Sequence, residues 1–293
     1  MGANPCRNWS DSSNHPRTRT VTAASNISSS GIPQHTVPPV AIVTGGGTGV
    51  GQATALKLAA LGYRLVINYS RSRTDAEATA AEITAVGGQV RCLQADIASD
   101  DDCRRLADTA MQAFGRIDVL VNCAGTTDFI PFPQLEQVST ETWLRLYQVN
   151  VVGAFQCTRA VVEPMRQSGG GCVINVSSVA AQLGQGSSIP YCCSKAALDN
   201  LTVSLARTLA PQIRVNGIAP GFIAGRWTQN GLGERYENIR QAYERSLPLQ
   251  QVCQPADIAD GIISLITGSR LVTGQTLVVD GGMLIAGYQV KFD

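Results

Sequence analysis

Short runs of apolar, mainly β-branched residues recur from Val40 onward and alternate with longer amphipathic stretches. The runs are Val40–Val43, Arg64–Asn68, Val90–Leu93, Ile117–Val121, Val173–Val176, Ile213–Asn216 and Thr276–Val279. Such short, nearly uninterrupted runs are typical of strands buried on both faces of a parallel sheet. Helical patterns lie between them at residues 50–61, 75–86, 99–114, 139–167 and 189–210. The alternation predicts an α/β fold, a single-domain, doubly wound, parallel seven-stranded sheet with helices on both faces.

The first 39 residues differ from the rest of the chain. Residues 1–39 are rich in Ser and Thr, contain five prolines and show no helix or strand period. We expect a disordered N-terminal extension, followed by one folded domain over residues 40–293. A transit peptide is the alternative, because the segment contains Arg and Ser and few acids. Pro5, Pro16 and Pro33 would interrupt the amphipathic helix that such a peptide needs.

Composition excludes several classes of function. The net charge of +1 gives no global field that would attract nucleic acid or an acidic membrane, and no apolar stretch of about 18 residues could span a bilayer. The chain has two histidines, His15 and His35, both before the first strand, so we expect neither a Ser-His-Asp triad nor a metal site. Nine cysteines without a Cys-x-x-Cys pair indicate buried thiols in a reducing, cytoplasmic setting.

A glycine-rich loop follows the first predicted strand and precedes a helix. It reads Thr44-Gly45-Gly46-Gly47-Thr48-Gly49-Val50-Gly51. Glycines at this place in a Rossmann-type fold let the backbone turn sharply and approach a pyrophosphate, which binds at the helix N-terminus. The loop predicts a dinucleotide site, and a simple tight turn is the alternative.

The end of the second strand indicates which dinucleotide binds. An acid commonly grips the two ribose hydroxyls of NAD at this place, but the chain has Ser70 and Arg71 here, with Arg73 nearby and no acid before Asp75. Ser70 and Arg71 would donate to a 2′-phosphate, so we expect NADP(H) in preference to NAD(H). An ordinary solvated loop is the alternative.

Tyr191 and Lys195 lie four residues apart on one helix face, and Ser178 lies thirteen residues before Tyr191. Four further motifs follow predicted strands or a helix in order: Asn122-Cys123-Ala124-Gly125, Asn150 within Val149–Gly153, Asn216–Gly221 and Asp280-Gly281-Gly282. Together with Gly45-x-x-x-Gly49-x-Gly51, they make residues 40–285 resemble the short-chain dehydrogenase/reductases, in the single-domain branch that includes 3-oxoacyl carrier-protein reductases. The resemblance implies a catalytic domain over residues 40–293.

The resemblance and the chemistry of these side chains predict their roles. Free Tyr has a pKa near 10, and a neighbouring ammonium together with the positive nicotinamide of an oxidised cofactor lowers such a value. We therefore expect Lys195 and the cofactor to make Tyr191 a general acid/base for a carbonyl or alcohol. Ser178 would donate to the oxygen on which charge develops. The resemblance implies that Lys195 also holds the nicotinamide ribose and that Asn150 supports a proton-relaying water.

The resemblance also implies the remaining cofactor contacts. Asp96 and Ile97 should flank the adenine, and Pro220, Gly221 and Ile223 should face the nicotinamide. The full set of expected cofactor contacts is Gly45, Thr48, Gly49, Val50, Gly51, Ser70, Arg71, Asp96, Ile97, Asn122, Ala124, Gly125, Tyr191, Lys195, Pro220, Gly221 and Ile223. Cys123 and Gly225 depart from the family pattern, which commonly has Asn and Thr there. For Gly225 we expect weaker binding on the nicotinamide side.

The sequence leaves the substrate open. Carrier-protein reductases generally have basic side chains near the mouth, whereas the corresponding stretches, 168–171 and 210–212, have none. Arg166 and Arg214 flank these stretches and are the candidates to substitute for the missing bases. We therefore expect a general carbonyl reductase with a small-molecule substrate. The alternatives are oxidation of a sugar, polyol or hydroxysteroid, and a non-catalytic, cofactor-sensing scaffold.

Two expectations concern the architecture around the site. Residues 222–250 should form a helical flap over the pocket. The resemblance implies a homotetramer or homodimer formed through residues 139–167, 189–210 and the apolar end from Met283 to Tyr288.

Overall fold

A single parallel sheet forms the centre of the structure, a computed structural model that describes residues 37–286. Its strands are β1 (Val40–Val43), β2 (Arg64–Tyr69), β3 (Val90–Gln94), β4 (Val119–Asn122), β5 (Gly171–Val176), β6 (Ile213–Pro220) and β7 (Thr276–Val279). Their order in the sheet is β3-β2-β1-β4-β5-β6-β7, and all six pairings are parallel. The chain therefore reverses direction across the sheet between β1 and β4, which is where ligands bind in doubly wound folds. The predicted fold class is confirmed.

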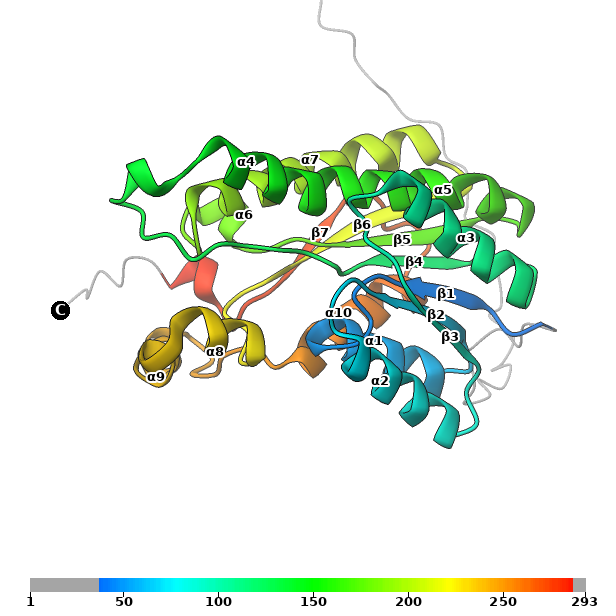
Figure 1. Cartoon of the computed structure of the whole chain (residues 1–293), viewed down its shortest axis with the longest axis horizontal. Helices are drawn as coiled ribbons and strands as arrows, with labels where there is room; N and C mark the ends of the chain where they lie inside the picture. Colours follow the sequence, from blue (N-terminus) through cyan, green and yellow to red (C-terminus); the bar gives the residue numbers. More distant parts are fainter. Residues whose placement is uncertain (1–36, 287–293) are drawn as a thin grey trace, which may run out of the picture. The chain divides into compact units, whose positions relative to one another are not determined.

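Helices cover both faces of this sheet (Figure 1). The α-helices are α1 (Gly49–Ala60), α2 (Arg73–Ala85), α3 (Asp100–Phe114), α4 (Thr140–Tyr147), α5 (Ala154–Gln167), α6 (Ala180–Leu183), α7 (Ile189–Leu209), α8 (Arg226–Leu232), α9 (Tyr236–Ser246) and α10 (Pro255–Thr267). A π-helix, η2 (Gln148–Gly153), and three 3₁₀ turns, η1 (Leu135–Gln137), η3 (Gly233–Arg235) and η4 (Met283–Ile285), complete the elements. In Figure 1, α1, α2 and α10 lie on one face, and α3, α5 and α7 lie on the other.

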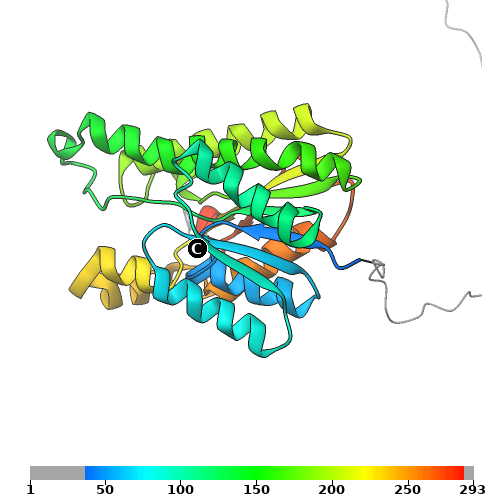
Figure 2. The ribbon, with the colours of Figure 1, turned by 45° about the vertical axis from the view of Figure 1, so that its right-hand side comes forward.

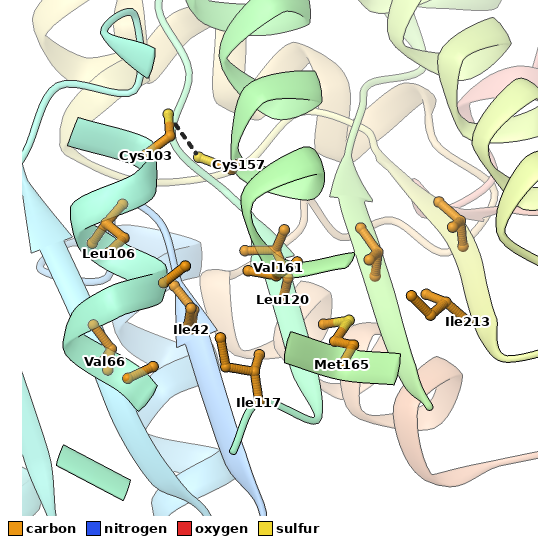
Figure 3. Packing of buried hydrophobic residues seen from close by; sticks show 14 of the residues in the cluster. Ile42, Val66, Cys103, Leu106, Ile117, Leu120, Cys157, Val161, Met165 and Ile213 are labelled. Atoms are coloured by element: carbon orange, nitrogen blue, oxygen red, sulfur yellow. Dashed lines mark hydrogen bonds between the residues drawn. The ribbon is translucent and has the colours of Figure 1, made fainter. Parts of the chain in front are cut away.

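The core explains why the strands are apolar without alternation. In β1, Val40 and Ile42 pack into the cluster beneath α3 and α5, whereas Ala41 and Val43 pack into the cluster beneath α1 and α10. Figure 3 shows the first cluster, where Ile42 lies near Leu106 of α3 and the strand side chains face α5. Because both faces of each central strand lose water on folding, every position in β1 is buried.

Two helical segments differ from the predictions. The helix expected over residues 139–167 is three elements, since the π-helix η2 separates α4 from α5. The sequence reading also missed α10, although Gln254 and Asp257 form a reciprocal capping box and Pro255 stands in its first turn. The flap predicted over residues 222–250 is helical, as α8 and α9.

The described residues 37–286 bear on the predictions about cysteines, metal sites and membrane spans. The eight cysteines between Cys92 and Cys253 are free thiols. Cys103 and Cys157, drawn in Figure 3, have sulfurs 3.4 Å apart. Between residues 37 and 286, no group of three His, Cys, Asp or Glu side chains could hold a metal, and no helix is long and apolar enough to cross a membrane. The predicted extension up to residue 36 and the predicted contact at Tyr288 lie outside the described residues.

Candidate active site

The start of α7 presents the predicted tyrosine and lysine. Ser188 caps the helix by accepting a hydrogen bond from the Tyr191 N–H (3.4 Å), and Pro190 lies in the first turn, where its missing N–H costs little. Tyr191 and Lys195 share one face of the helix, and Lys195 Nζ lies 5.7 Å from the centroid of the Tyr191 ring. Because α7 begins at the carboxyl edge of the sheet, both side chains lie where a doubly wound fold binds its ligand.

Ser178, two residues beyond β5, contacts Tyr191. Burial raises the pKa of Tyr191 to about 12, although a hydrogen bond with the Ser178 side chain lowers it. The consequence is chemical: Tyr191 is a neutral phenol at pH 7 and holds the proton that a general acid must donate. The lowering of this pKa by the Lys195 ammonium together with an oxidised nicotinamide stays a prediction.

Lys195 is a buried cation held by a backbone carbonyl. Only 5% of its surface is exposed, and its Nζ donates to the Val176 carbonyl at 2.8 Å. Burial lowers the pKa of Lys195 to about 8, against smaller opposing effects of Cys123 and Asp199. The lysine is therefore mainly an ammonium at pH 7 and loses its charge as the pH rises through about 8.

Asn150 lies inside the π-helix η2, which aims its side chain across the site. Its Oδ1 accepts from the Thr126 N–H (2.8 Å), and its Nδ2 donates to the Thr126 carbonyl and to Ser194 Oγ, both at 3.0 Å. Asn150 therefore joins the loop after β4 to α7, one residue before Lys195. π-helical turns occur frequently at functional sites. The sequence signal for this site was Asn150 itself, a polar residue between Val149 and Val151.

The glycine loop has the backbone that its sequence predicts. Gly45 and Gly49 have positive φ angles of 65° and 54°, and a Cβ on Gly51 would lie 2.2 Å from the Gly45 carbonyl oxygen. Two residues that the sequence analysis missed hold the loop: Asn68 Oδ1 accepts from the Gly45 N–H (3.0 Å), and Thr44 Oγ1 accepts from two N–H groups after β4. A polar Asn inside the apolar run of β2 was the available signal.

A cavity of about 450 Å³ lies beside the end of β2. It is lined by Ser70, Arg71, Gln94, Asp96, Asp102 and Arg105. The structure thus brings three predicted residues together, Ser70, Arg71 and Asp96, and adds Arg105 and Asp102. Arg105 donates to Asp102 at 2.5 Å, and Asp102 Oδ2 accepts from the Asp96 N–H at 2.7 Å.

Two predicted cofactor residues have buried side chains. The Ile97 side chain is 4% exposed and packs against Gly153 in the core, so it does not line the cavity. Asn122 is 3% exposed, and its Nδ2 donates to Asn175 Oδ1 (2.9 Å) and to Thr158. Buried amides that find protein partners stabilise the packing of a strand against its neighbours. The placement of Ile97 beside the adenine and of Asn122 on the ribose side stays a prediction.

The other predicted residues lie on the carboxyl edge of the sheet. Ala124 packs against Gly45, and a Cβ on Gly125 would lie 3.3 Å from Asn150 Oδ1 and 3.7 Å from Lys195 Nζ. Thr48 and Val50 flank Gly49 at the start of α1. Pro220 ends β6, the Gly221 N–H donates to the Val279 carbonyl (3.0 Å), and Ile223 pairs with Cys253 before the flap begins.

The two arginines considered as part of the mouth are not there. Arg214 is the second residue of β6, and its guanidinium donates to the carbonyls of Leu265, Ile266 and Val272. Arg214 therefore donates hydrogen bonds to carbonyl groups in the last turn of α10, at the amino edge of the sheet. Arg166, in the last turn of α5, also precedes a strand rather than following one. The hypothesis that Arg166 and Arg214 supply basic groups near the mouth is wrong. Stretches 168–171 and 210–212 precede β5 and β6, and so they lie at the edge of the sheet opposite Tyr191.

The residues present fit a dinucleotide. A Cβ on Gly49 would meet nothing within 4 Å, so the loop faces open space at the N-terminus of α1, where free N–H groups favour phosphate. Ser70, Arg71 and Arg105 supply donors at one end of this site, and Lys195 supplies an ammonium at the other. The glycine loop could hold a pyrophosphate between these two ends.

Comparison with known proteins places the chain in a family. The short chain dehydrogenase family model matches residues 39–234. The chain is 42% identical over 244 residues to a protein described as a ketoacyl reductase of the granaticin polyketide synthase from Streptomyces violaceoruber, covering 83% of this chain and 95% of that one. It is 40% identical over 250 residues to a 3-oxoacyl-[acyl-carrier-protein] reductase from Synechocystis sp., covering 84% and 97% respectively.

A crystal structure of a protein described as a short-chain dehydrogenase/reductase from Burkholderia xenovorans is also similar. It superimposes with a TM-score of 0.79 at 37% identity, covering 85% of this chain and 99% of that one. This chain belongs to the short-chain dehydrogenase/reductase family. It is an oxidoreductase, and membership of the family implies a nicotinamide cofactor.

Proposed function

We propose that this protein reduces the 3-oxo group of an acyl thioester with NADPH. One observation carries the proposal: the half-buried Tyr191 phenol bonds to Ser178, and its ring lies 5.7 Å from Lys195 Nζ. A phenol that retains its proton at pH 7 can give that proton to a carbonyl oxygen, which carbonyl reduction requires. The names of the two relatives support a 3-oxoacyl substrate in preference to a general ketone.

Each side chain of the site has a separate role in the reduction. The Tyr191 hydroxyl donates its proton to the carbonyl oxygen, and Ser178 donates a hydrogen bond to the same oxygen, where negative charge develops. The bound dinucleotide supplies the hydride that the carbonyl carbon accepts. Lys195 holds the nicotinamide ribose and favours the phenolate that remains after proton donation. Asn150 keeps the loop after β4 and α7 in register and supports a water that returns a proton to the site.

Cofactor preference depends on the cavity at the end of β2. Ser70 and Arg71 lie there with Arg105, so a 2′-phosphate would meet one hydroxyl and two guanidinium groups. The carboxylates of Asp96 and Asp102 line the same cavity, and Arg105 pairs with Asp102. Charge-assisted hydrogen bonds from arginine to phosphate are short and strong. We therefore propose that NADPH binds in preference to NADH.

The test is the rate of NADPH and NADH oxidation with a 3-oxoacyl thioester, offered on coenzyme A and on acyl carrier protein. A simple ketone and an aldehyde complete the substrate panel. We expect NADPH-dependent turnover of the thioester, and loss of turnover in Tyr191→Phe with the Kd for NADPH unchanged. Full activity of Tyr191→Phe would contradict the mechanism, and tight cofactor binding without turnover of any carbonyl would favour the scaffold alternative. Turnover of the ketone alone would contradict the substrate class.

We also propose that the chain assembles as a homotetramer or homodimer. Leu144 of α4, Phe155 of α5 and Val203 of α7 are large apolar side chains exposed on the helices expected at the interface. Exposed apolar side chains that gather on one surface commonly mark an interface. Light scattering should give a mass at least twice that of the chain, and a monomer at micromolar concentration would contradict the assembly.

A further inference from the structure

One ion pair connects the flap to the cofactor half of the domain. Arg226, the first residue of α8, donates to both carboxylate oxygens of Asp75 in the first turn of α2, at 3.1 and 2.8 Å. The segments that it joins follow β6 and β2, which are separated in the sheet by β5, β4 and β1. The pair therefore lies across the carboxyl edge, where the chain reverses direction. Figure 2 shows the ribbons of the two helices that it joins, α8 in yellow and α2 in cyan.

Asp75 lies close to the expected phosphate contacts. It is the one acid in the first turn of α2, four residues beyond Arg71. The next residue, Ala76, packs so tightly on the glycine loop that a Cβ on Gly47 would lie 2.8 Å from the Ala76 Cα. Asp75 therefore directly precedes the residue that packs on the glycine loop, and it lies four residues beyond Arg71, which lines the cavity. An unpaired carboxylate there would repel a 2′-phosphate and could accept hydrogen bonds from free ribose hydroxyls.

We propose that Arg226 determines dinucleotide specificity by masking Asp75. The bidentate pair neutralises a carboxylate that, in addition to Asp96 and Asp102 in the cavity itself, could serve NAD(H) and repel NADP(H), so a flap residue would influence cofactor preference. This inference rests on the proposed function only in that a nicotinamide dinucleotide must bind. It concerns this chain's own pairing of α8 with α2, in addition to the contacts of Ser70 and Arg71.

The flap has other contacts that keep α8 in place when the ion pair is removed. Gly231 packs directly on the Phe129 ring, since a Cβ there would lie 1.9 Å from a ring carbon. Thr228 Oγ1 donates to the Ile223 carbonyl (2.8 Å). Trp227 reaches the site itself, because its Cη2 would lie 3.8 Å from a Cβ on Gly125. A substitution of Arg226 should therefore change the charge beside Asp75 without displacing α8.

The test measures Kd values for NADPH and NADH by energy transfer from tryptophan to the bound reduced nicotinamide. Four proteins form a cycle: the unchanged chain, Arg226→Ala, Asp75→Asn and the double variant. We expect Arg226→Ala to weaken NADPH binding about fivefold with NADH binding unchanged or tighter, as one unmasked charge near a phosphate predicts. Asp75→Asn should leave NADPH binding unchanged or tighter, and Arg226→Ala should have no further effect in that background.

The control and the contradicting outcomes follow from the same cycle. Arg240→Ala removes an equal charge from α9, where the arginine pairs within its own helix with Glu237 and Glu244, and should leave both Kd values unchanged. An equal loss of NADPH binding on Arg226→Ala in both backgrounds would mean that Arg226 contacts the cofactor directly, and no loss in either would also overturn the inference. Failure of the unchanged protein to bind either dinucleotide would instead overturn the proposed function.

Discussion

The two ends of the candidate site are built in opposite ways. At the Tyr191 end, Asn150, Ser194 and Lys195 are buried, and each has specific hydrogen-bond partners. At the Arg71 end, the charged groups are exposed, and the Arg226–Asp75 side chains are 57% and 37% accessible. Burial strengthens electrostatic interactions and makes unpaired groups costly, whereas water and salt weaken exposed pairs. We infer that the first end is constrained by packing and the second is tuned by charge.

Removing Ser178 should have the largest effect. Ser178→Ala deletes a donor to the developing oxyanion and the hydrogen bond that lowers the pKa of Tyr191. Loss of one such donor typically costs about a hundredfold or more in kcat, so we expect at least that loss with the Kd for NADPH unchanged. The pH profile of kcat should move further toward high pH. A variant with more than a tenth of the original kcat would contradict the role of Ser178.

Asn150→Ala tests whether the buried end is structural as well as chemical. The change removes three hydrogen bonds to Thr126 and Ser194, and we expect a loss of about 2 kcal/mol in the free energy of unfolding. Urea unfolding measures this value. Asn200→Ala, which changes an exposed asparagine on α7, is the matched control and should be neutral. Equal stabilities of the two variants would show that the Asn150 bonds contribute no net stability.

Lys195→Met tests the buried charge through pH. The folded pKa of about 8 is below the ordinary 10.5, so the unfolded chain binds more protons between these values, and stability rises as the pH passes from 7 to 9. We expect a rise of about 1 kcal/mol in the unchanged protein from this group and its loss in Lys195→Met. Lys57→Met, which removes a partly exposed lysine paired with Asp260, should retain the rise. The same rise in Lys195→Met would contradict the assignment.

Arg71→Ala tests the exposed end and should have the smallest effect. The Kd for NADPH should increase about fivefold at low salt, and the difference should shrink at high salt, because exposed charges are screened. The Kd for NADH should not change. Arg207→Ala, which removes an exposed arginine from the last turn of α7, is the control. Equal changes for both cofactors would exclude recognition of the 2′-phosphate by Arg71.

Local pattern was enough for much of the architecture. The seven apolar runs predicted the strands because strands buried on both faces need continuous apolar sequence, and the capping-box spacing of Ser99 and Asp102 matches the start of α3. The sequence analysis did not predict helix α10, which lies between the predicted flap and the last predicted strand. The π-helix around Asn150 was also missed, since a single extra residue in a helical turn leaves no periodic signal.

The sequence by itself determined the succession of strands and helices along the chain, the glycine loop, and the spacing of Tyr191 and Lys195. Each of these depends on residues that are close together in the chain. Tertiary structure decided which side chains meet. Burial raises the pKa of Tyr191, and this burial depends on the packing of the whole domain. Ile97 and Asn122 turn into the core, and Arg214 lies at the opposite edge of the sheet. The pairing of Arg226 with Asp75, 151 residues apart, exists only because the fold brings the segments after β2 and β6 together. No local pattern encodes such a contact, since its free energy depends on distance in space and on solvent exposure.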